Sequence, residues 1–170
     1  MAVSLFLGGC ATRVPAPLRD IPSPEVSVAQ VRQDTEKFIG TRVRWGGSIA
    51  VVENRSSETL IEIVSQPLDR DGRPQLTRAT GGRFLAEFPD FLDPLIYGER
   101  RQLTVVGTLR GEVTRRIGDY EYAFPVVAVE SHYLWERVTY PSPAPIDWWR
   151  YDCWPYPYSR YAWPFGPYCW

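Results

Sequence analysis

The sequence predicts a small, mainly β domain: a five-stranded, OB-like antiparallel barrel with one short N-terminal helix and an irregular C-terminal tail rich in aromatic residues and proline. Three observations support this prediction. Apolar and polar residues alternate along several short segments, as they do in half-buried strands. A glycine pair interrupts the first of these segments, and the last two are joined by a two-residue turn. An open antiparallel sheet with a helix on one face is the alternative.

One helix is predicted before the first strand. Ser27 and Gln30 have the spacing of a capping box, and Gly40 is suited to the C-terminal end of a helix. Three apolar residues between these ends fall near one helical face: Val28, Val31 and Phe38. The alternating start of this segment also fits a strand, so that alternative stays open.

The first strand is predicted over residues 41–52, where the sequence alternates with a period of two. One face is apolar and is formed by Val43, Trp45, Ile49 and Val51. The other face is polar and is formed by Arg42, Arg44 and Ser48. Glycine within a strand often marks a bulge, so Gly46-Gly47 is expected to form a bulge or a sharp bend.

Four further strands are predicted, at 59–64, 83–88, 102–110 and 120–129. Ile61 and Ile63 share one face of the first of these. The inward face of the strand at 102–110 contains Leu103, Val105, Gly107 and Leu109. This strand continues past Gly111 toward Ile117, and Gly118-Asp119 has the composition of a type II′ hairpin turn. The loop at 67–74 is expected to be tightest at Asp71-Gly72.

Cys10 follows a short apolar run and the small pair Gly8-Gly9, as does the acylated cysteine of a bacterial lipoprotein. Ala11, where an Asp usually means retention in the inner membrane, favours the outer membrane, with the domain in the periplasm. The leader has no Lys or Arg and is shorter than a secretory signal peptide, so either the true start lies upstream or the likeness is accidental. In the second case, Cys10 is an ordinary thiol.

The chain of 170 residues has a net charge of −1, so it offers no basic field for nucleic acid. No apolar stretch reaches the roughly 20 residues that a membrane-spanning helix needs. The expected partner is therefore the outer membrane, reached through N-terminal acyl chains, with other envelope components as further partners. Four parts are predicted: a signal peptide truncated at its start (1–9), a lipidated cysteine with a tether (10–25), the barrel domain (26–137) and the tail (138–170).

The tail combines prolines with tryptophan and tyrosine, a composition that excludes regular helix or sheet. Its aromatic rings either pack on the barrel, lie at the bilayer interface, or form a platform for a ligand such as a saccharide. The candidate interface or ligand aromatics are Trp148, Trp149, Trp154, Trp163 and Trp170. Cys153 and Cys169 are a candidate disulfide in an oxidising periplasm, the alternative being two separate thiols.

Residues for catalysis or for holding a metal are few. His132 is the only histidine and no Cys-x-x-Cys pair occurs, so neither a metal site nor a cofactor is predicted, and His132 is expected to be structural. Two pairs of carboxylates lie in loops. Asp90 and Asp93 fit turn chemistry better than acid–base chemistry, and Asp69 with Asp71 lacks the other ligands of a calcium loop. The sequence thus predicts no catalytic residue and no enzyme.

A succession of short motifs resembles the Slp family of outer-membrane lipoproteins. The motifs run in order through most of the folded part: 38–47 (FIGTRVRWGG), 58–63 (ETLIEI), 66–69 (QPLD), 82–85 (GRFL), 91–94 (FLDP) with Tyr97, 106–111 (VGTLRG) and the aromatic close at 122–135. The resemblance implies an outer-membrane lipoprotein of the starvation-inducible or stationary-phase type. It supports Cys10 as the lipid site and implies no catalytic residue.

Two functions follow from these observations. The first is a non-enzymatic lipoprotein that contributes to envelope integrity or to stress tolerance in starvation or stationary phase. The second is a periplasmic binding module that holds a glycan or a lipid on its barrel face or on its aromatic tail.

Overall fold

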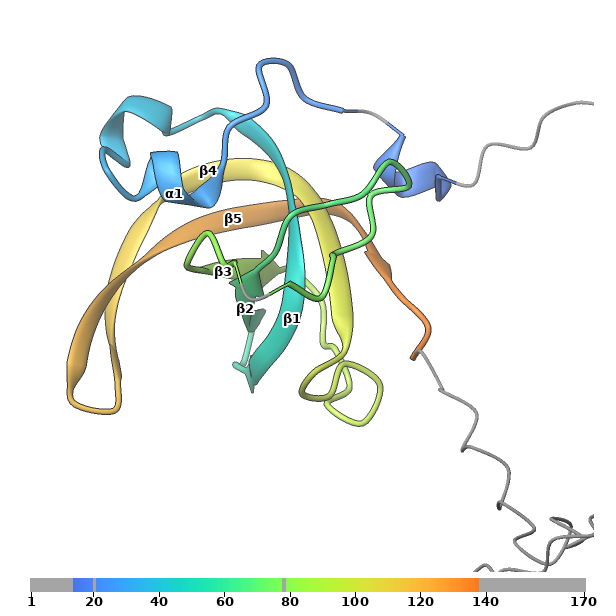
Figure 1. Ribbon diagram of the computed structural model, residues 1–170. Helices are drawn as coiled ribbons and strands as arrows, with labels where there is room; N and C mark the ends of the chain where they lie inside the picture. The colour runs from blue at the N-terminus through green and yellow to red at the C-terminus, as the bar shows by residue number, and fades with distance from the viewer. Residues whose placement is uncertain (1–13, 20, 78, 138–170) are drawn as a thin grey trace, which may run out of the picture. The chain divides into compact units, whose positions relative to one another are not determined.

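Five strands close into a barrel in the order β1-β2-β3-β5-β4 (Figure 1). The computed structural model describes residues 14–19, 21–77 and 79–137. Neighbouring strands are antiparallel except β3 and β5, which are parallel. The small five-stranded barrel predicted from the sequence is confirmed. The strands are β1 (Arg42–Asn54), β2 (Thr59–Ser65), β3 (Arg83–Phe88), β4 (Gln102–Ile117) and β5 (Tyr120–Leu134).

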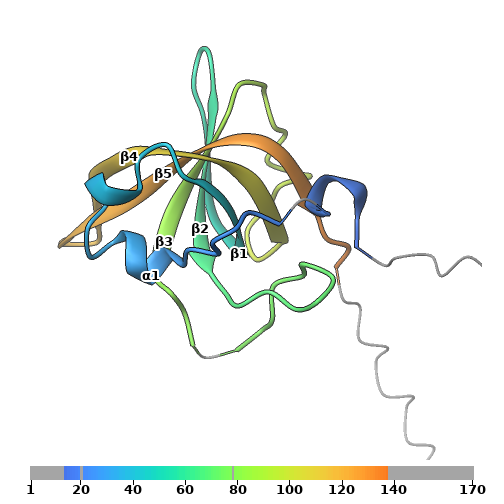
Figure 2. The same cartoon turned by 90° about the horizontal axis from the view of Figure 1, so that it is seen from above.

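The last two strands form a hairpin that extends beyond the barrel (Figures 1 and 2). Its turn is Gly118-Asp119, and Gly118 has a φ of 61°, which fits the predicted type II′ turn. β5 is longer than predicted, because Glu130 is an extra residue in the ladder with β4, between Val129 and Ser131. This bulge shifts the alternation by one position, so the strand continues where the sequence no longer shows a clear period.

The bulge of β1 lies at Ala50, where the register with β2 shifts between Ile49 and Val51. Val51 is therefore 50% exposed, so its predicted inward position is wrong. Gly46-Gly47, predicted as the bulge or bend, pairs with β4 without interruption. The glycines instead allow close approach of the strands, since a Cβ on Gly47 would overlap the carbonyl of Val64.

The predicted helix is shorter than expected. α1 (Val28–Val31) begins at Ser27 with the predicted capping box but ends after one turn, and a separate 3-10 turn, η2 (Glu36–Phe38), follows. Asp34 accepts a hydrogen bond from the backbone N–H of Lys37, and Thr35 donates its hydroxyl to the carbonyl of Val31. Short polar side chains compete in this way with the backbone bonds of a helix.

The core fills the barrel and includes the apolar residues around α1. Val28 and Val31 are buried with residues of all five strands. Trp45 and Phe84 meet edge to face with their ring centroids 5.2 Å apart. α1 therefore covers the apolar interior on one side of the barrel, as seen in Figure 2.

Residues 14–19, which the sequence places in a tether, pack against the outside of the barrel. The 3-10 turn η1 (Ala16–Leu18) places Leu18 in a buried cluster with Val106 and Trp135. Ser131 donates a hydrogen bond to the carbonyl of Pro17, at 3.0 Å. Leu18 is fully buried against the outer surface of β4 and the residue after β5, a position that no periodicity in residues 10–25 indicates.

Candidate functional site

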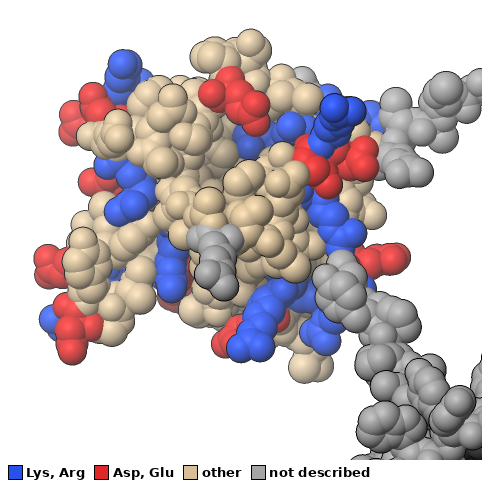
Figure 3. Space-filling view, in the orientation of Figure 1, with Lys and Arg blue, Asp and Glu red and all other residues tan. Residues whose placement is uncertain are grey.

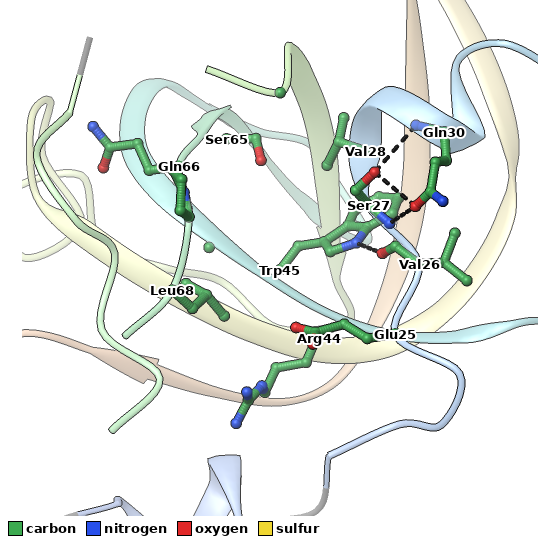
Figure 4. A pocket seen from close by; sticks show the side chains of 13 residues that line it. Glu25, Val26, Ser27, Val28, Gln30, Arg44, Trp45, Ser65, Gln66 and Leu68 are labelled. Carbon is green, nitrogen blue, oxygen red and sulfur yellow. Dashed lines mark hydrogen bonds between the residues drawn. The ribbon is translucent and has the colours of Figure 1, made fainter. Parts of the chain in front are cut away.

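A pocket of about 410 Å³ lies between the chain before α1 and one side of the barrel. The segments 25–28, 44–46 and 65–68 supply most of its lining. They come from the start of α1, from β1, and from the end of β2 with the loop that follows (Figure 4). Its volume falls in the range of small-molecule sites.

The wall of the pocket beside α1 is rigid. Trp45 is 4% exposed, and its indole N–H donates to the carbonyl of Val26 at 2.6 Å. Ser27 and Gln30 are hydrogen-bonded to each other in the capping box, as the dashed lines in Figure 4 show. These hydrogen bonds hold the indole of Trp45 and the start of α1 in one arrangement at the pocket.

Arg44 is the charged residue buried at this pocket. It is 8% exposed, and its Nη1 donates to the carbonyl of Leu18 at 3.2 Å. Its Nε is buried without a hydrogen-bond partner among the described residues. Figure 4 shows its guanidinium directed away from Trp45. The buried Nε is closed to a ligand, but the positive charge of Arg44 in the pocket lining favours an anionic or hydrogen-bond-accepting group there.

His132 lies in β5 and holds the β3–β4 loop (residues 89–101) against the barrel. Its Nε2 is 2.9 Å from the hydroxyl of Tyr97, and its ring lies edge-on to Phe88. Burial lowers the pKa of His132 and raises the pKa of Tyr97. This environment fits the structural role expected for the histidine, since its partner is a loop side chain.

One carboxylate of each pair accepts hydrogen bonds within a turn. Asp69 accepts hydrogen bonds from the backbone N–H groups of Asp71 and Arg73, both at 2.9 Å. Asp93 accepts from the N–H of Leu95 at 2.8 Å. Within the described part of the chain, no three His, Cys, Asp or Glu side chains come together as a metal site. The turn chemistry predicted for Asp93 is confirmed.

The other predicted site residues lie outside the described residues: Cys10, Cys153, Cys169, Trp148, Trp149, Trp154, Trp163 and Trp170. Sequence reasoning missed two features. One is the pocket at Arg44, which the alternation of β1 placed on an outward face. The other is an exposed apolar patch on the β3–β4 loop, for which the signal was the pair of apolar dipeptides around Asp93-Pro94.

The charges and the helices give two further observations. Basic and acidic side chains are interspersed over the face shown in Figure 3, in keeping with the net charge of −1. Of the helices in the described residues, none has both the length and the apolar character to cross a membrane.

Comparisons with known proteins relate the chain to envelope lipoproteins. A model of the outer membrane lipoprotein Slp family matches residues 7–164. The uncharacterized lipoprotein YeaY of Escherichia coli K12 is 36% identical over 166 residues, covering 94% of this chain and 84% of the relative. The outer membrane protein Slp of the same strain is 28% identical over 166 residues, covering 96% of this chain and 84% of the relative. An uncharacterized protein of Haemophilus influenzae is 28% identical over 158 residues, with 90% and 83% covered.

Proposed function

This chain belongs to the outer membrane lipoprotein Slp family, and from that premise we propose that acylated Cys10 tethers it and that it acts without catalysis in envelope integrity or in starvation and stationary-phase tolerance. The outer membrane is thus its location. The barrel lies on the periplasmic side of that membrane, and its acyl chains are its contact with the lipid.

The position of Cys10 supports the anchor. The family match begins at residue 7 and so includes this cysteine. Burial of acyl chains contributes about 0.8 kcal/mol per methylene, and two or more chains give stable attachment. A processed lipoprotein cysteine has two or three chains, so the tethered protein stays with the bilayer.

The described residues support a non-enzymatic role. His132 is hydrogen-bonded to Tyr97, and the carboxylates of Asp69 and Asp93 are occupied by backbone N–H groups. At the pocket, Ser27 and Gln30 bond each other. These polar groups are thus used to hold turns and loops in place, which supports a structural use of side chains that could otherwise serve in general acid–base catalysis.

Metabolic labelling with a palmitate analogue tests the anchor, combined with separation of inner and outer membranes. The wild type is expected to be labelled and to fractionate with the outer membrane, whereas Cys10→Ala is unlabelled. Cys153→Ala is the matched control and keeps the label, because only the cysteine behind the signal peptide is acylated. An unlabelled wild type, or a label that persists in Cys10→Ala, contradicts the proposal.

The tail at 138–170 is a further part of the proposal. Its five tryptophans contact the envelope or a ligand, and Cys153 and Cys169 form a disulfide. Truncation after Arg137 separates two roles of the tail. Loss of glycan or lipid retention with an intact barrel supports a binding role, and loss of the fold supports a packing role.

A second candidate function is a binding module for a glycan or a lipid, and the pocket at Arg44 favours it. The pocket combines an apolar wall at Trp45 and Leu68 with the positive charge of Arg44. This combination suits a molecule with an apolar part and an acidic or strongly accepting group. Native mass spectrometry of the purified protein is expected to show a bound species that Leu68→Trp removes by filling the pocket. The absence of a bound species from the wild type argues against this function.

A further inference from the structure

The β3–β4 loop displays an exposed apolar patch formed by Phe91, Leu95 and Ile96. Their exposed fractions are 72%, 87% and 54%. Single apolar residues are common at protein surfaces. Three within six positions of one loop give a larger exposed apolar area, of the kind found at interaction sites. The neighbouring Leu92 and Tyr97 pack against the core, so the loop divides its apolar side chains between the barrel and the outside.

The backbone holds this patch in place. The carbonyl of Asp93 accepts hydrogen bonds from the N–H groups of Ile96 and Tyr97, at 3.0 and 2.9 Å. Asn54 donates to the carbonyl of Leu92 at 3.2 Å, which ties the loop to the end of β1. Because the turn is hydrogen-bonded internally and to the barrel, the backbone that bears the patch has a fixed position.

Arg101 links the patch to the region where residues 14–19 pack. Its Nη1 donates to the carbonyl of Ile96 at 3.0 Å, and its Nη2 donates to the carbonyl of Trp135 at 2.9 Å. Trp135 belongs to the buried cluster of Leu18, against which Val14 also packs. The loop, the end of β5 and the first described residues are therefore joined through successive contacts.

The short chain before Val14 limits how far the barrel can move from an anchor. Cys10 precedes Val14 by four residues, a length that spans at most about 14 Å when fully extended. If Cys10 is acylated, as the proposed function requires, Val14 stays within roughly that distance of the membrane surface. The bilayer is thus the nearest large apolar phase to this part of the barrel.

The charges around the patch are balanced. Asp90, Asp93 and Glu99 lie in the loop with Arg100 and Arg101, and Arg137 lies beside Gly98. A contact at this place therefore depends on apolar burial, and added salt is expected to change it little.

We propose that Phe91, Leu95 and Ile96 insert into the boundary between headgroups and acyl chains of the membrane that bears the anchor. The loop is then a second, non-covalent contact, and it orients the barrel on the bilayer. This inference rests on the proposed anchor at Cys10. The membrane is proposed as the occupant because the tether limits the distance between Val14 and the bilayer, and the contacts of Arg101 join the cluster around Val14 to the loop. The C-terminal tail and a second copy of the chain are the other occupants, and the experiment below distinguishes them from the membrane.

Site-specific photo-crosslinking tests the contact in the full-length, acylated protein. A benzophenone amino acid replaces Leu95, and the protein is reconstituted in vesicles of phosphatidylethanolamine and phosphatidylglycerol. The matched control has the same group in place of Ile39, an exposed apolar residue (54%) between η2 and β1, on the other side of the barrel from η1 in Figure 1. Lipid adducts, measured by mass spectrometry, are expected to be at least about fivefold more abundant at position 95 than at position 39.

Each outcome of this experiment decides the proposal. Adducts of position 95 with residues 138–170 show that the tail covers the loop, and adducts between two chains show a second copy; both overturn the membrane contact. Equal lipid adducts at positions 95 and 39 also overturn it. Mass spectrometry of the purified protein checks acylation of Cys10 separately, so a missing acyl chain refutes the anchor, whereas an acylated protein without adducts at position 95 refutes only the loop contact.

Discussion

Two regions of the molecule, the chain around α1 and the β3–β4 loop, differ in the exposure of their apolar side chains. Around α1, Val28 and Val31 are buried against Trp45. On the loop, Phe91 and Leu95 face outward. Both regions are held by short polar side chains that cap turns. The difference teaches that a capped turn fixes where apolar groups point, and the surrounding strands decide whether anything covers them.

The largest effect on stability is expected from a substitution in the buried region around α1. Trp45→Ala removes the ring that packs on Phe84 and the hydrogen bond to Val26, and we expect the free energy of unfolding to fall by about 3–5 kcal/mol. Urea unfolding followed by circular dichroism measures it. Trp45→Phe, which keeps a ring but lacks the N–H, is the control and is expected to lose less. A Trp45→Ala variant as stable as the wild type contradicts the assignment of this core.

The cap of α1 is expected to have a smaller effect. Ser27→Ala removes the side-chain acceptor for the N–H of Gln30 and is expected to cost about 1 kcal/mol. Ser27→Asp, which restores an acceptor, is the matched control and is expected to recover most of the stability. If Ser27→Ala is neutral in thermal unfolding, the short helix does not depend on its capping box.

The contact that holds the loop to the barrel is expected to depend on pH. Burial lowers the pKa of His132 in the folded state, so the unfolded chain takes up a proton at a higher pH than the folded chain does. The free energy of unfolding therefore decreases as the pH falls below the unfolded value of about 6.5 and levels off below the folded pKa. The His132→Gln variant should lack this portion of the pH dependence. An identical profile for both proteins between pH 7 and pH 5 would contradict the role of His132.

The smallest expected effect concerns the outward side of the loop. Phe91→Ser and Leu95→Ser are each expected to change the free energy of unfolding by no more than about 0.5 kcal/mol, because these side chains are mostly exposed to solvent. Leu92→Ser, one position from Phe91, is the control and is expected to cost more, since Leu92 packs against the core. A large loss for Leu95→Ser would mean that a part of the chain covers this residue.

Much of the barrel could be predicted from residue patterns. β3 has the predicted limits, β2 extends one residue further, and Ile61 and Ile63 are fully buried as expected. In these strands, period-two alternation is not interrupted, so alternate residues share the face that packs in the core: Ile61, Ile63, Phe84, Ala86 and Phe88. The patterns failed at Val51 and beyond Val129, where bulges at Ala50 and Glu130 shift the alternation. A bulge depends on the register of the neighbouring strand, which the sequence of one strand does not contain.

The candidate site was less predictable. Arg44 lies on the polar face of β1, and only the packing of Leu18 and the chain before α1 over that face makes it buried. The patch of Phe91, Leu95 and Ile96 was visible as apolar residues near Asp93-Pro94, but its exposure depends on which of them the barrel covers. Long-range packing decides both features.

The sequence by itself determined the local elements of this protein: the alternating strands, the capped start of α1, the Gly118-Asp119 turn and the resemblance to outer-membrane lipoproteins through residue order. Only the tertiary structure decided that η1 docks on β4 and β5, that Arg44 is buried and that the β3–β4 loop turns three apolar side chains outward. The physical reason is range. Backbone preferences and periodicity act between residues near in sequence, whereas burial depends on segments far apart in the chain that meet when the barrel closes.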